Sequence, residues 1–201
     1  MPTPRKPPRR PAAPLSREVW VKAAQALIVR EGVAAVAVEP LAQALGVTKG
    51  SFYWHFENRD ALVHAALEAW EQDQSADMVS QCGGIADPRR GLRALLFAAF
   101  EGIENGSFFA SLAVSSEDPR VQPYLRRATA RRLAFGMEAF QALGLSEKES
   151  LARALLAYAA YAGYFQLLRT SPEAVEAVTD LSGYVRRLAD ALVPARVLRR
   201  P

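Results

Sequence analysis

The stretch "ALGVTKGSFYWHF", residues 44–56, decides the fold of this chain. A helix that runs into this stretch ends at Gly46, and a second helix can begin at Thr48, because threonine caps helix N-termini. Two short helices joined by such a tight turn form a helix-turn-helix, in which the second helix fits the major groove of DNA. The stretch therefore predicts a nucleic-acid-binding surface close to the start of the sequence.

The second of these helices carries the polar groups that such a surface needs. Lys49 can reach guanine acceptors or phosphates, and Thr48 and Ser51 can donate to phosphates or base edges. Gly50 has no Cβ, so the backbone there can approach DNA closely. The alternative interpretation is a solvent-exposed helix whose aromatic side chains only pack against the rest of the protein.

The aromatic side chains of this segment divide into two groups. Tyr53 and His55 are expected to point a polar ring atom outward, and Arg59 adds a cation for phosphate at the start of the next helix. Phe52 and Phe56 lie four residues apart, so the spacing places them on one helix face toward the core.

The formal charge of the chain is concentrated at the same end. Residues 1–60 hold nine Lys and Arg against five Asp and Glu, whereas the remaining residues hold 16 of each kind. This asymmetry points to an anionic partner, nucleic acid or a membrane surface. Residues 1–14 are basic and proline-rich and are predicted to be a disordered tail. That tail could lie along DNA or could simply keep the protein soluble.

Helix signals dominate the rest of the chain and predict an all-α fold of about nine helices. Gly32 ends a first helix that Ser16 caps, a short helix covers about 40–45, and Asn58 with Asp60 opens a long helix that runs toward Val79. Later helices are expected at 88–105, 107–115, 119–143, 147–169 and 172–193. The predicted domains are the tail 1–14, a DNA-binding domain 15–62, a larger helical domain 63–195 and a tail 196–201. Because the boundary lies inside the long helix, that helix can transmit motion between the two domains.

Several functional classes are disfavoured by what the sequence lacks. No apolar run approaches the roughly 20 residues that span a bilayer, and the basic N-terminus has no apolar signal region. Cys82 is the only cysteine and the two histidines have no partners at metal-ligand spacing, so neither a disulfide, a metal nor a cofactor is predicted. No nucleophile set, phosphate loop or carboxylate pair indicates an enzyme. The expectation is a cytoplasmic protein that is not an enzyme and does not bind membranes.

Residues 32–67, "GVAAVAVEPLAQALGVTKGSFYWHFENRDALVHAAL", resemble the DNA-binding domain of the TetR family of bacterial repressors. The resemblance covers the glycine after the first helix, "LAQALGV", "YWHF" and the "NRDAL" that opens the long helix. It implies an all-helical homodimer with an N-terminal DNA-binding domain and a variable ligand-binding and dimerisation domain. The positions implied at the DNA are Thr48, Lys49, Gly50, Ser51, Tyr53, Trp54, His55 and Arg59.

One position departs from the family pattern. Family members usually have threonine or serine where this chain has Ala37 or Val38, and there the hydroxyl caps the second helix and touches phosphate. Neither side chain can do this, and the nearby Glu39 would be repelled by phosphate.

The second half of the chain suggests two tasks. Alanine-rich segment 151–168 and the helix after it allow close helix packing and are predicted to form a four-helix bundle across a dimer, although a core within one chain is the alternative. The predicted dimer contacts are Leu155, Ala159, Gly163, Leu167, Leu181, Tyr184, Val185 and Leu188.

The other predicted task is to bind a ligand. Aromatic residues are frequent enough here to line a pocket for an apolar or planar molecule, although each could be ordinary core. Two glutamates on the same helix could face a cationic ligand or could simply be solvated. The predicted lining is Phe97, Phe100, Glu101, Glu104, Phe108, Phe135, Phe140, Tyr161 and Phe165. The arginines at 126, 127, 131 and 132 are interpreted as a solvated helix face partly paired with acidic neighbours.

Together these features predict a transcriptional regulator, a repressor released from a palindromic double-stranded DNA operator by an unidentified small apolar or aromatic ligand. A dimer would place its two recognition helices about 34–36 Å apart, in successive major grooves. The alternative is a DNA-bound structural or interaction protein of the same fold with no effector. A second domain without a cavity would favour that alternative.

Overall fold

The computed structural model describes residues 15–82, 85–177 and 180–195, and within these ranges every regular element is a helix. This confirms the all-α prediction. The two predicted tails, 1–14 and 196–201, lie outside the described residues. The elements are α1 (Arg17–Glu31), η1 (Val33–Ala35), α2 (Val38–Ala44), α3 (Lys49–Tyr53), α4 (Arg59–Cys82), α5 (Pro88–Glu101), α6 (Ile103–Val114), α7 (Gln122–Gln141), α8 (Glu147–Thr170), α9 (Pro172–Glu176) and α10 (Leu181–Leu192).

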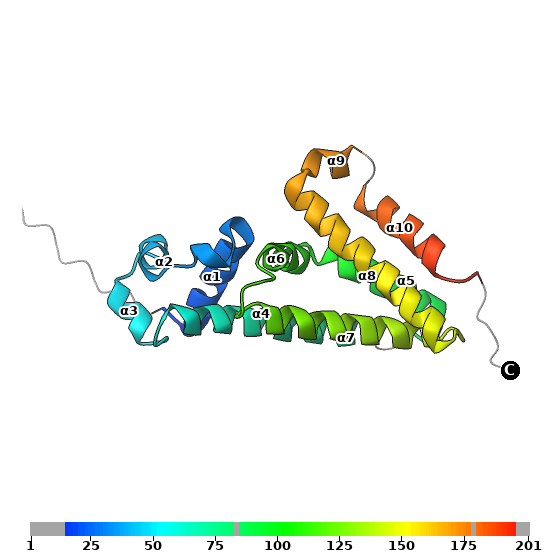
Figure 1. Cartoon of the computed structure of the whole chain (residues 1–201), viewed down its shortest axis with the longest axis horizontal. Helices are drawn as coiled ribbons and strands as arrows, with labels where there is room; N and C mark the ends of the chain where they lie inside the picture. Colours follow the sequence, from blue (N-terminus) through cyan, green and yellow to red (C-terminus); the bar gives the residue numbers. More distant parts are fainter. Residues whose placement is uncertain (1–14, 83–84, 178–179, 196–201) are drawn as a thin grey trace, which may run out of the picture.

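Helices α1 to α3 pack around one aromatic centre at one end of the molecule (Figure 1). The Trp20 ring of α1 meets the Phe52 ring of α3 edge-on with centroids 5.4 Å apart, and Phe56 stacks on Phe52 at 5.5 Å. All three are buried. The predicted inward orientation of the two phenylalanines is therefore confirmed, and their burial fixes which side of α3 faces outward.

Helix α4 runs from this end along the second half of the molecule, with α7 alongside it (Figure 1). It begins where the Asn58 side chain accepts a hydrogen bond from the Ala61 amide at 2.9 Å. It packs against α1 at its start and against α5 and α7 further on. The helix is continuous through residues 62 and 63, where the domain boundary is expected.

Several predicted element bounds are wrong, each for a local reason. The stretch 172–193 is two helices, because the Asp180 carboxylate accepts from the Gly183 amide and caps a new start. Asp118 accepts from the Arg120 amide at 2.9 Å within a turn, so α7 begins only at Gln122. The break between α5 and α6 falls at Gly102. Ten α-helices are thus present among the described residues, against the nine expected.

Residues 33–38, "VAAVAV", form an apolar run that is short enough to suggest a strand. They contain the 3-10 helix η1 and the start of α2 instead. Helix α2 has Ala37 at its N-cap and no capping side chain, which confirms that this position cannot cap it.

Candidate functional site

The turn between α2 and α3 has the geometry that its sequence predicts. Gly46 has a φ of +68°, a left-handed conformation that glycine adopts without strain. The Val47 amide donates to the Ala42 carbonyl oxygen at 3.0 Å, which closes the turn. Thr48 occupies the N-cap of α3 in extended conformation, but its hydroxyl makes no capping hydrogen bond.

The outward side of α3 presents the predicted contact residues together. Thr48, Lys49, Gly50 and Tyr53 are exposed, and Ser51 is half-buried. Trp54 at the end of α3 is 87% exposed, which is unusual for so large an apolar ring. The helix therefore offers polar and aromatic groups to solvent on one face.

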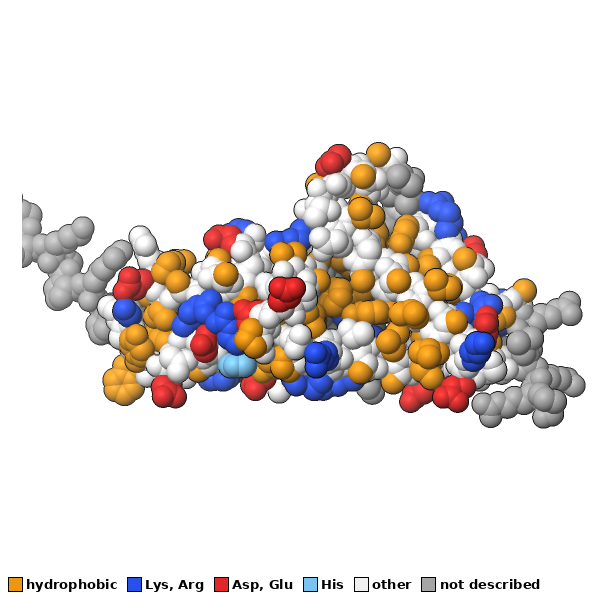
Figure 2. Space-filling model, viewed as in Figure 1, with side chains coloured by type: hydrophobic (Ala, Val, Ile, Leu, Met, Phe, Trp, Pro, Cys, Tyr) orange, Lys and Arg blue, Asp and Glu red, His pale blue; other side chains and the backbone are white. Residues whose placement is uncertain are grey.

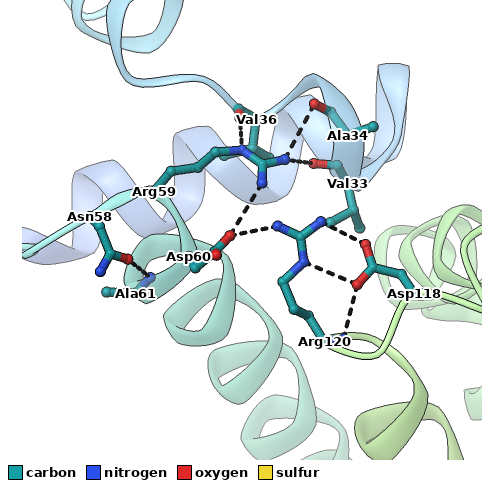
Figure 3. Close-up of polar contacts among 9 residues, drawn as sticks. All are labelled: Val33, Ala34, Val36, Asn58, Arg59, Asp60, Ala61, Asp118 and Arg120. Atoms are coloured by element: carbon teal, nitrogen blue, oxygen red, sulfur yellow. Dashed lines mark hydrogen bonds and ion pairs between the residues drawn. The ribbon is translucent and has the colours of Figure 1, made fainter.

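Two of the predicted contact residues are turned inward. His55 is half-buried, and its Nε2 is out of contact with solvent and has no hydrogen-bond partner. The Arg59 guanidinium donates from Nε to the Val36 carbonyl oxygen at 2.5 Å and from Nη2 to Val33 and Ala34 at 3.0 and 3.3 Å (Figure 3). The prediction that Arg59 faces phosphate is thus corrected. Its donors bind backbone carbonyl oxygens in and just after η1, so Arg59 connects η1 to the start of α4.

Lys49 and Glu39 form an exposed ion pair of 2.6 Å between α3 and α2. The hydrogen bond from Lys49 lowers the pKa of the Glu39 carboxyl. The expected repulsion between Glu39 and phosphate is therefore partly neutralised by Lys49. The two residues are ten positions apart on different helices, so neither helix pattern indicates the pairing.

A network of four charged side chains joins this end of the molecule to the second half (Figure 3). Arg120, in the turn before α7, donates to Asp60 at 2.5 Å and to Asp118 at 2.6 and 3.0 Å. Asp60 in turn pairs with Arg59 at 3.2 Å. Hydrogen bonds from Arg120 lower the pKa of both carboxyls. We call these residues the Arg59–Arg120 network. The sequence gives no signal for it, because the expected helix 119–143 places Arg120 inside a helix rather than in a turn.

A second link joins the two halves at the last turn of α1. The Val29 carbonyl oxygen accepts from Arg169 Nη1 at 3.1 Å and from the Ser111 hydroxyl at 3.0 Å. Arg169 lies near the end of α8 and Ser111 on α6. The last turn of α1 is thereby held by two helices of the second half.

Helices α5, α7 and α8 enclose a cavity of about 360 Å³. This volume lies within the range of small-molecule sites. Five of the nine residues predicted to line a pocket do line this cavity: Phe100, Glu101, Phe135, Phe140 and Tyr161. Leucines of α5, small residues of α8, Arg132 and Tyr158 complete the wall.

The other four predicted lining residues lie elsewhere. Phe108 packs on Trp70 with ring centroids 5.5 Å apart, and Glu104 is exposed. Phe165 fills the space over Gly106, where a Cβ would come within 2.2 Å of its ring. Phe97 is half-buried against the core. For these aromatics the alternative interpretation, ordinary packing, fits the structure.

The arginine group on α7 is divided between two faces, which corrects part of its interpretation. Arg127 and Arg131 reach Glu71 of α4 at 2.8 and 2.9 Å, as a paired helix face should, and the pKa of Glu71 is lowered by the hydrogen bond from Arg127. Arg132 turns the other way and lies over the rings around the cavity. Successive residues of a helix point about 100° apart, so neighbours in sequence face different surroundings.

The predicted dimer residues also divide. Leu155 and Leu167 are 53% and 51% exposed, and Ala159 and Gly163 between them are exposed as well. Leu181, Tyr184 and Leu188 of α10 are half-buried against their own chain. Val185 is 1% exposed and packs inside one chain, so the prediction that it contacts a partner is wrong.

The comparisons with known proteins bear on the N-terminal end. The family model described as bacterial regulatory proteins of the TetR family matches residues 21–66, a range that contains α2, the turn, α3 and the start of α4. Over residues 21–66 the chain matches the TetR family. The cavity and the exposed face of α8 lie outside the matched range.

Two curated relatives share about a third of the aligned residues with this chain. The HTH-type transcriptional regulator TtgR of Pseudomonas putida is 33% identical over 86 residues, which are 42% of this chain and 41% of the relative. The probable acrEF/envCD operon repressor of Escherichia coli K12 is 32% identical over 92 residues, 44% and 40% of the two chains. The match thus spans about two fifths of the length of each relative.

The fold extends further than the sequence match. A TetR transcriptional regulator from Chloroflexus aurantiacus superposes with a TM-score of 0.75 over 90% of this chain and 95% of its own, at 23% identity. Among the described residues, no helix has the length and apolar character needed to cross a membrane. The described part of the chain also holds no group of three metal-ligating side chains.

Proposed function

We propose that this chain is a TetR-family DNA-binding transcriptional regulator that reads its operator with α3. The observation that carries the proposal is the exposed face formed by Thr48, Lys49 and Gly50. The buried Phe52 on the opposite side of α3 orients this face toward solvent, and all four residues lie within the range that matches the family model. Such a face supplies hydrogen-bond donors to phosphates and base edges and lets the backbone approach the groove.

The regulator is proposed to act as a homodimer in the cytoplasm on a palindromic operator. Leu151, Leu155, Ala159, Gly163 and Leu167 recur every fourth residue on α8 and form one exposed apolar stripe. Figure 2 shows hydrophobic side chains gathered over this part of the molecule. Among the described residues, no atom beyond the local backbone of α8 lies within 4 Å of a Cβ placed at Gly163, so the fold of the single chain does not require the glycine there. A second copy of α8 packed on this stripe would cover it, since monomers seldom expose such stripes.

The regulator is further proposed to be a repressor that a small ligand releases. The cavity favours a ligand-responsive repressor over a DNA-bound protein with no effector, because it provides space for a ligand in the second half of the chain. Helix α7 contributes Phe135 and Phe140 to the cavity and Arg127 and Arg131 to the pairing with Glu71 of α4. A ligand that shifts α7 therefore moves α4 and with it α3.

The Arg59–Arg120 network offers a second connection for that motion. It ties the turn before α7 to the first residues of α4, directly beyond α3. The proposed dimer has one arrangement whose two recognition helices fit the operator and another in which their spacing is altered. A ligand that binds the altered arrangement more tightly lowers operator affinity, and the size of the effect is set by the ligand's difference in affinity for the two arrangements.

The test is an electrophoretic mobility shift on the DNA that flanks the chain's own gene, followed by selection from random DNA. We expect a specific shift that weakens steeply between about 50 and 200 mM salt, because released counterions drive phosphate binding. Lys49→Ala should weaken binding and reduce the salt slope by about one. Failure to retain any specific sequence from either source would contradict the proposal.

A further inference from the structure

The cavity is apolar on most of its surface and polar at a few points. Leu92, Leu95, Leu96, Phe135 and Phe140 supply much of the wall. The charged or hydroxyl-bearing side chains that line it are Glu101, Arg132, Tyr158 and Tyr161. Such a small set of polar groups in an apolar wall is what fixes the orientation and chemical class of a ligand.

Arg132 lacks the counter-charge that its neighbours have. Arg127 and Arg131 both pair with Glu71, whereas no carboxylate of the described residues forms an ion pair with Arg132. Its guanidinium lies over the rings of Phe109, Tyr158 and Tyr161, at 5.2, 5.9 and 4.8 Å from their centroids. The ring faces attract the guanidinium cation but supply no hydrogen-bond acceptor for its N–H groups.

One nitrogen of Arg132 is unsatisfied. Nη2 donates to the Tyr161 hydroxyl at 3.3 Å, while Nη1 has no contact with solvent and no hydrogen-bond partner. A buried donor without an acceptor is costly, and more so on a charged group. An acceptor that arrives with a ligand would remove this cost.

Tyr161 adds a second donor beside Arg132. Its hydroxyl oxygen already accepts from Arg132, so its own hydrogen is left to donate. Burial raises the pKa of Tyr161, although Arg132 opposes the shift, so the hydroxyl keeps its proton at neutral pH. The Tyr158 hydroxyl is engaged with Thr129 at 2.8 Å. The polar part of the cavity therefore offers donors and a positive charge.

The opposite charge on the wall is placed differently. Glu101 is exposed to solvent, whereas the Arg132 nitrogen is shielded from it. Electrostatic interactions are stronger where water is excluded, so the shielded cation has more influence on a bound ligand than the solvated carboxylate. This favours an anion over the cation that two glutamates on α5 and α6 would suggest.

We propose that the ligand of this cavity is an amphipathic carboxylate, with an apolar or aromatic body against the leucines and phenylalanines. Its carboxylate accepts hydrogen bonds from the Tyr161 hydroxyl and from the Arg132 guanidinium, which suits a planar acceptor. The guanidinium has to turn for Nη1 to reach the ligand, because that nitrogen has no accessible surface in this structure. The inference rests on the proposed function insofar as the cavity is the effector site. Arg132 is the residue that determines the charge class of the ligand.

The experiment compares three probes with one ring and chain: phenylbutyrate, phenylbutyramide and phenylbutylamine. Calorimetric titration of the full chain, without DNA, measures their affinities for the wild type, Arg132→Gln, Arg132→Lys and the control Arg126→Gln, an exposed arginine of the same helix. We expect the wild type and the control to bind the acid about tenfold or more tightly than the amide, since hydrogen bonds to charged groups are the strong ones.

Arg132→Gln should reduce the acid-to-amide ratio to about one while amide binding persists, and Arg132→Lys should retain part of the preference because it keeps the charge. Circular dichroism and melting temperatures establish that each variant is folded. Equal binding of acid and amide by the wild type, tightest binding of the amine, no binding of the acid, or an unchanged preference in Arg132→Gln would each overturn the proposal. Because DNA is absent, these results are separate from a failure of the mobility shift, which bears on the regulator itself.

Discussion

At the scale of the residue, the side chains of α3 divide into buried ones that pack on the core and exposed ones that are available to DNA. Phe52 and Phe56 are buried and fix its orientation, while Lys49 and Gly50 remain exposed. Lys49 is shared between Glu39 and any approaching phosphate, and exposed pairs of this kind are weak enough to be exchanged. Gly50 can be tested more clearly than Lys49, because packing against the described residues does not require a glycine at this position.

Gly50→Ala should leave the fold intact and weaken operator binding. Among the residues that the structure describes, an added Cβ would meet only the Thr48 Oγ1 at 3.6 Å, an ordinary contact, and alanine favours helix more than glycine does. Against DNA the same methyl would prevent close approach, at a cost of about 1–3 kcal/mol, which is roughly fivefold to a hundredfold in affinity. Melting temperature and fluorescence titration with operator DNA measure both effects. Unchanged affinity would show that the backbone at Gly50 does not approach the groove.

At the scale of the element, α7 and the turn before it connect the two halves. One face of α7 lines the cavity, another pairs with Glu71 of α4, and Arg120 holds Asp60 and Asp118. The pKa values of Asp60 and Asp118 are lowered in the folded chain by hydrogen bonds from Arg120. The stabilisation is therefore present above the aspartate pKa of the unfolded chain and is lost as pH falls through the lower folded values.

Arg120→Ala should lower the free energy of unfolding by on the order of 1 kcal/mol at neutral pH, after allowance for solvent screening. The difference from wild type should shrink toward about pH 3, below the aspartate pKa of about 3.9 in unfolded chains, because the carboxyls then become protonated. Urea unfolding at both pH values measures it, with Arg126→Ala as the matched control. An equal difference at the two pH values would mean that Arg120 acts through packing rather than charge.

At the scale of the whole molecule, the proposed dimer links the α8 stripe to the binding of DNA by α3. Two α3 helices can meet two half-sites only if the chains are joined, and the exposed leucines of α8 are the candidate joint. The stripe is separate from the residues of α8 that face inward, such as Tyr161 and Phe165, which are buried. Dimerisation can therefore be removed without disturbing the cavity.

Leu155→Glu should convert the dimer into a folded monomer and abolish tight operator binding. Leu155 is 53% exposed in the single chain, so a charge there costs the fold little but would be buried without a partner in the dimer. Light scattering after gel filtration gives the mass, and circular dichroism gives the helix content. Val114→Glu, at an apolar residue of α6 that is 65% exposed, is the control and should stay dimeric. A dimeric Leu155→Glu protein would place the interface elsewhere.

The sequence by itself determined the helix-turn-helix and the helical class, because their signals are local. Gly46 turns the chain, Phe52 and Phe56 lie one helical turn apart, and Ser146 caps α8 where its spacing to Glu149 predicts. Asp180 could have been found in the same way, since its carboxylate also caps the third residue after it.

Only the tertiary structure decided which way the long cationic side chains point. Arg59 resembles a phosphate ligand in sequence but donates to carbonyls 23 to 26 residues earlier, and Arg120 reaches Asp60, 60 residues away. Arg132 follows Arg131 directly, yet one faces the cavity and the other faces α4. A flexible charged side chain has no local pattern that selects its partner. The packing of α7 between α4 and α8 makes that selection, and it places a cation in the wall of an apolar cavity.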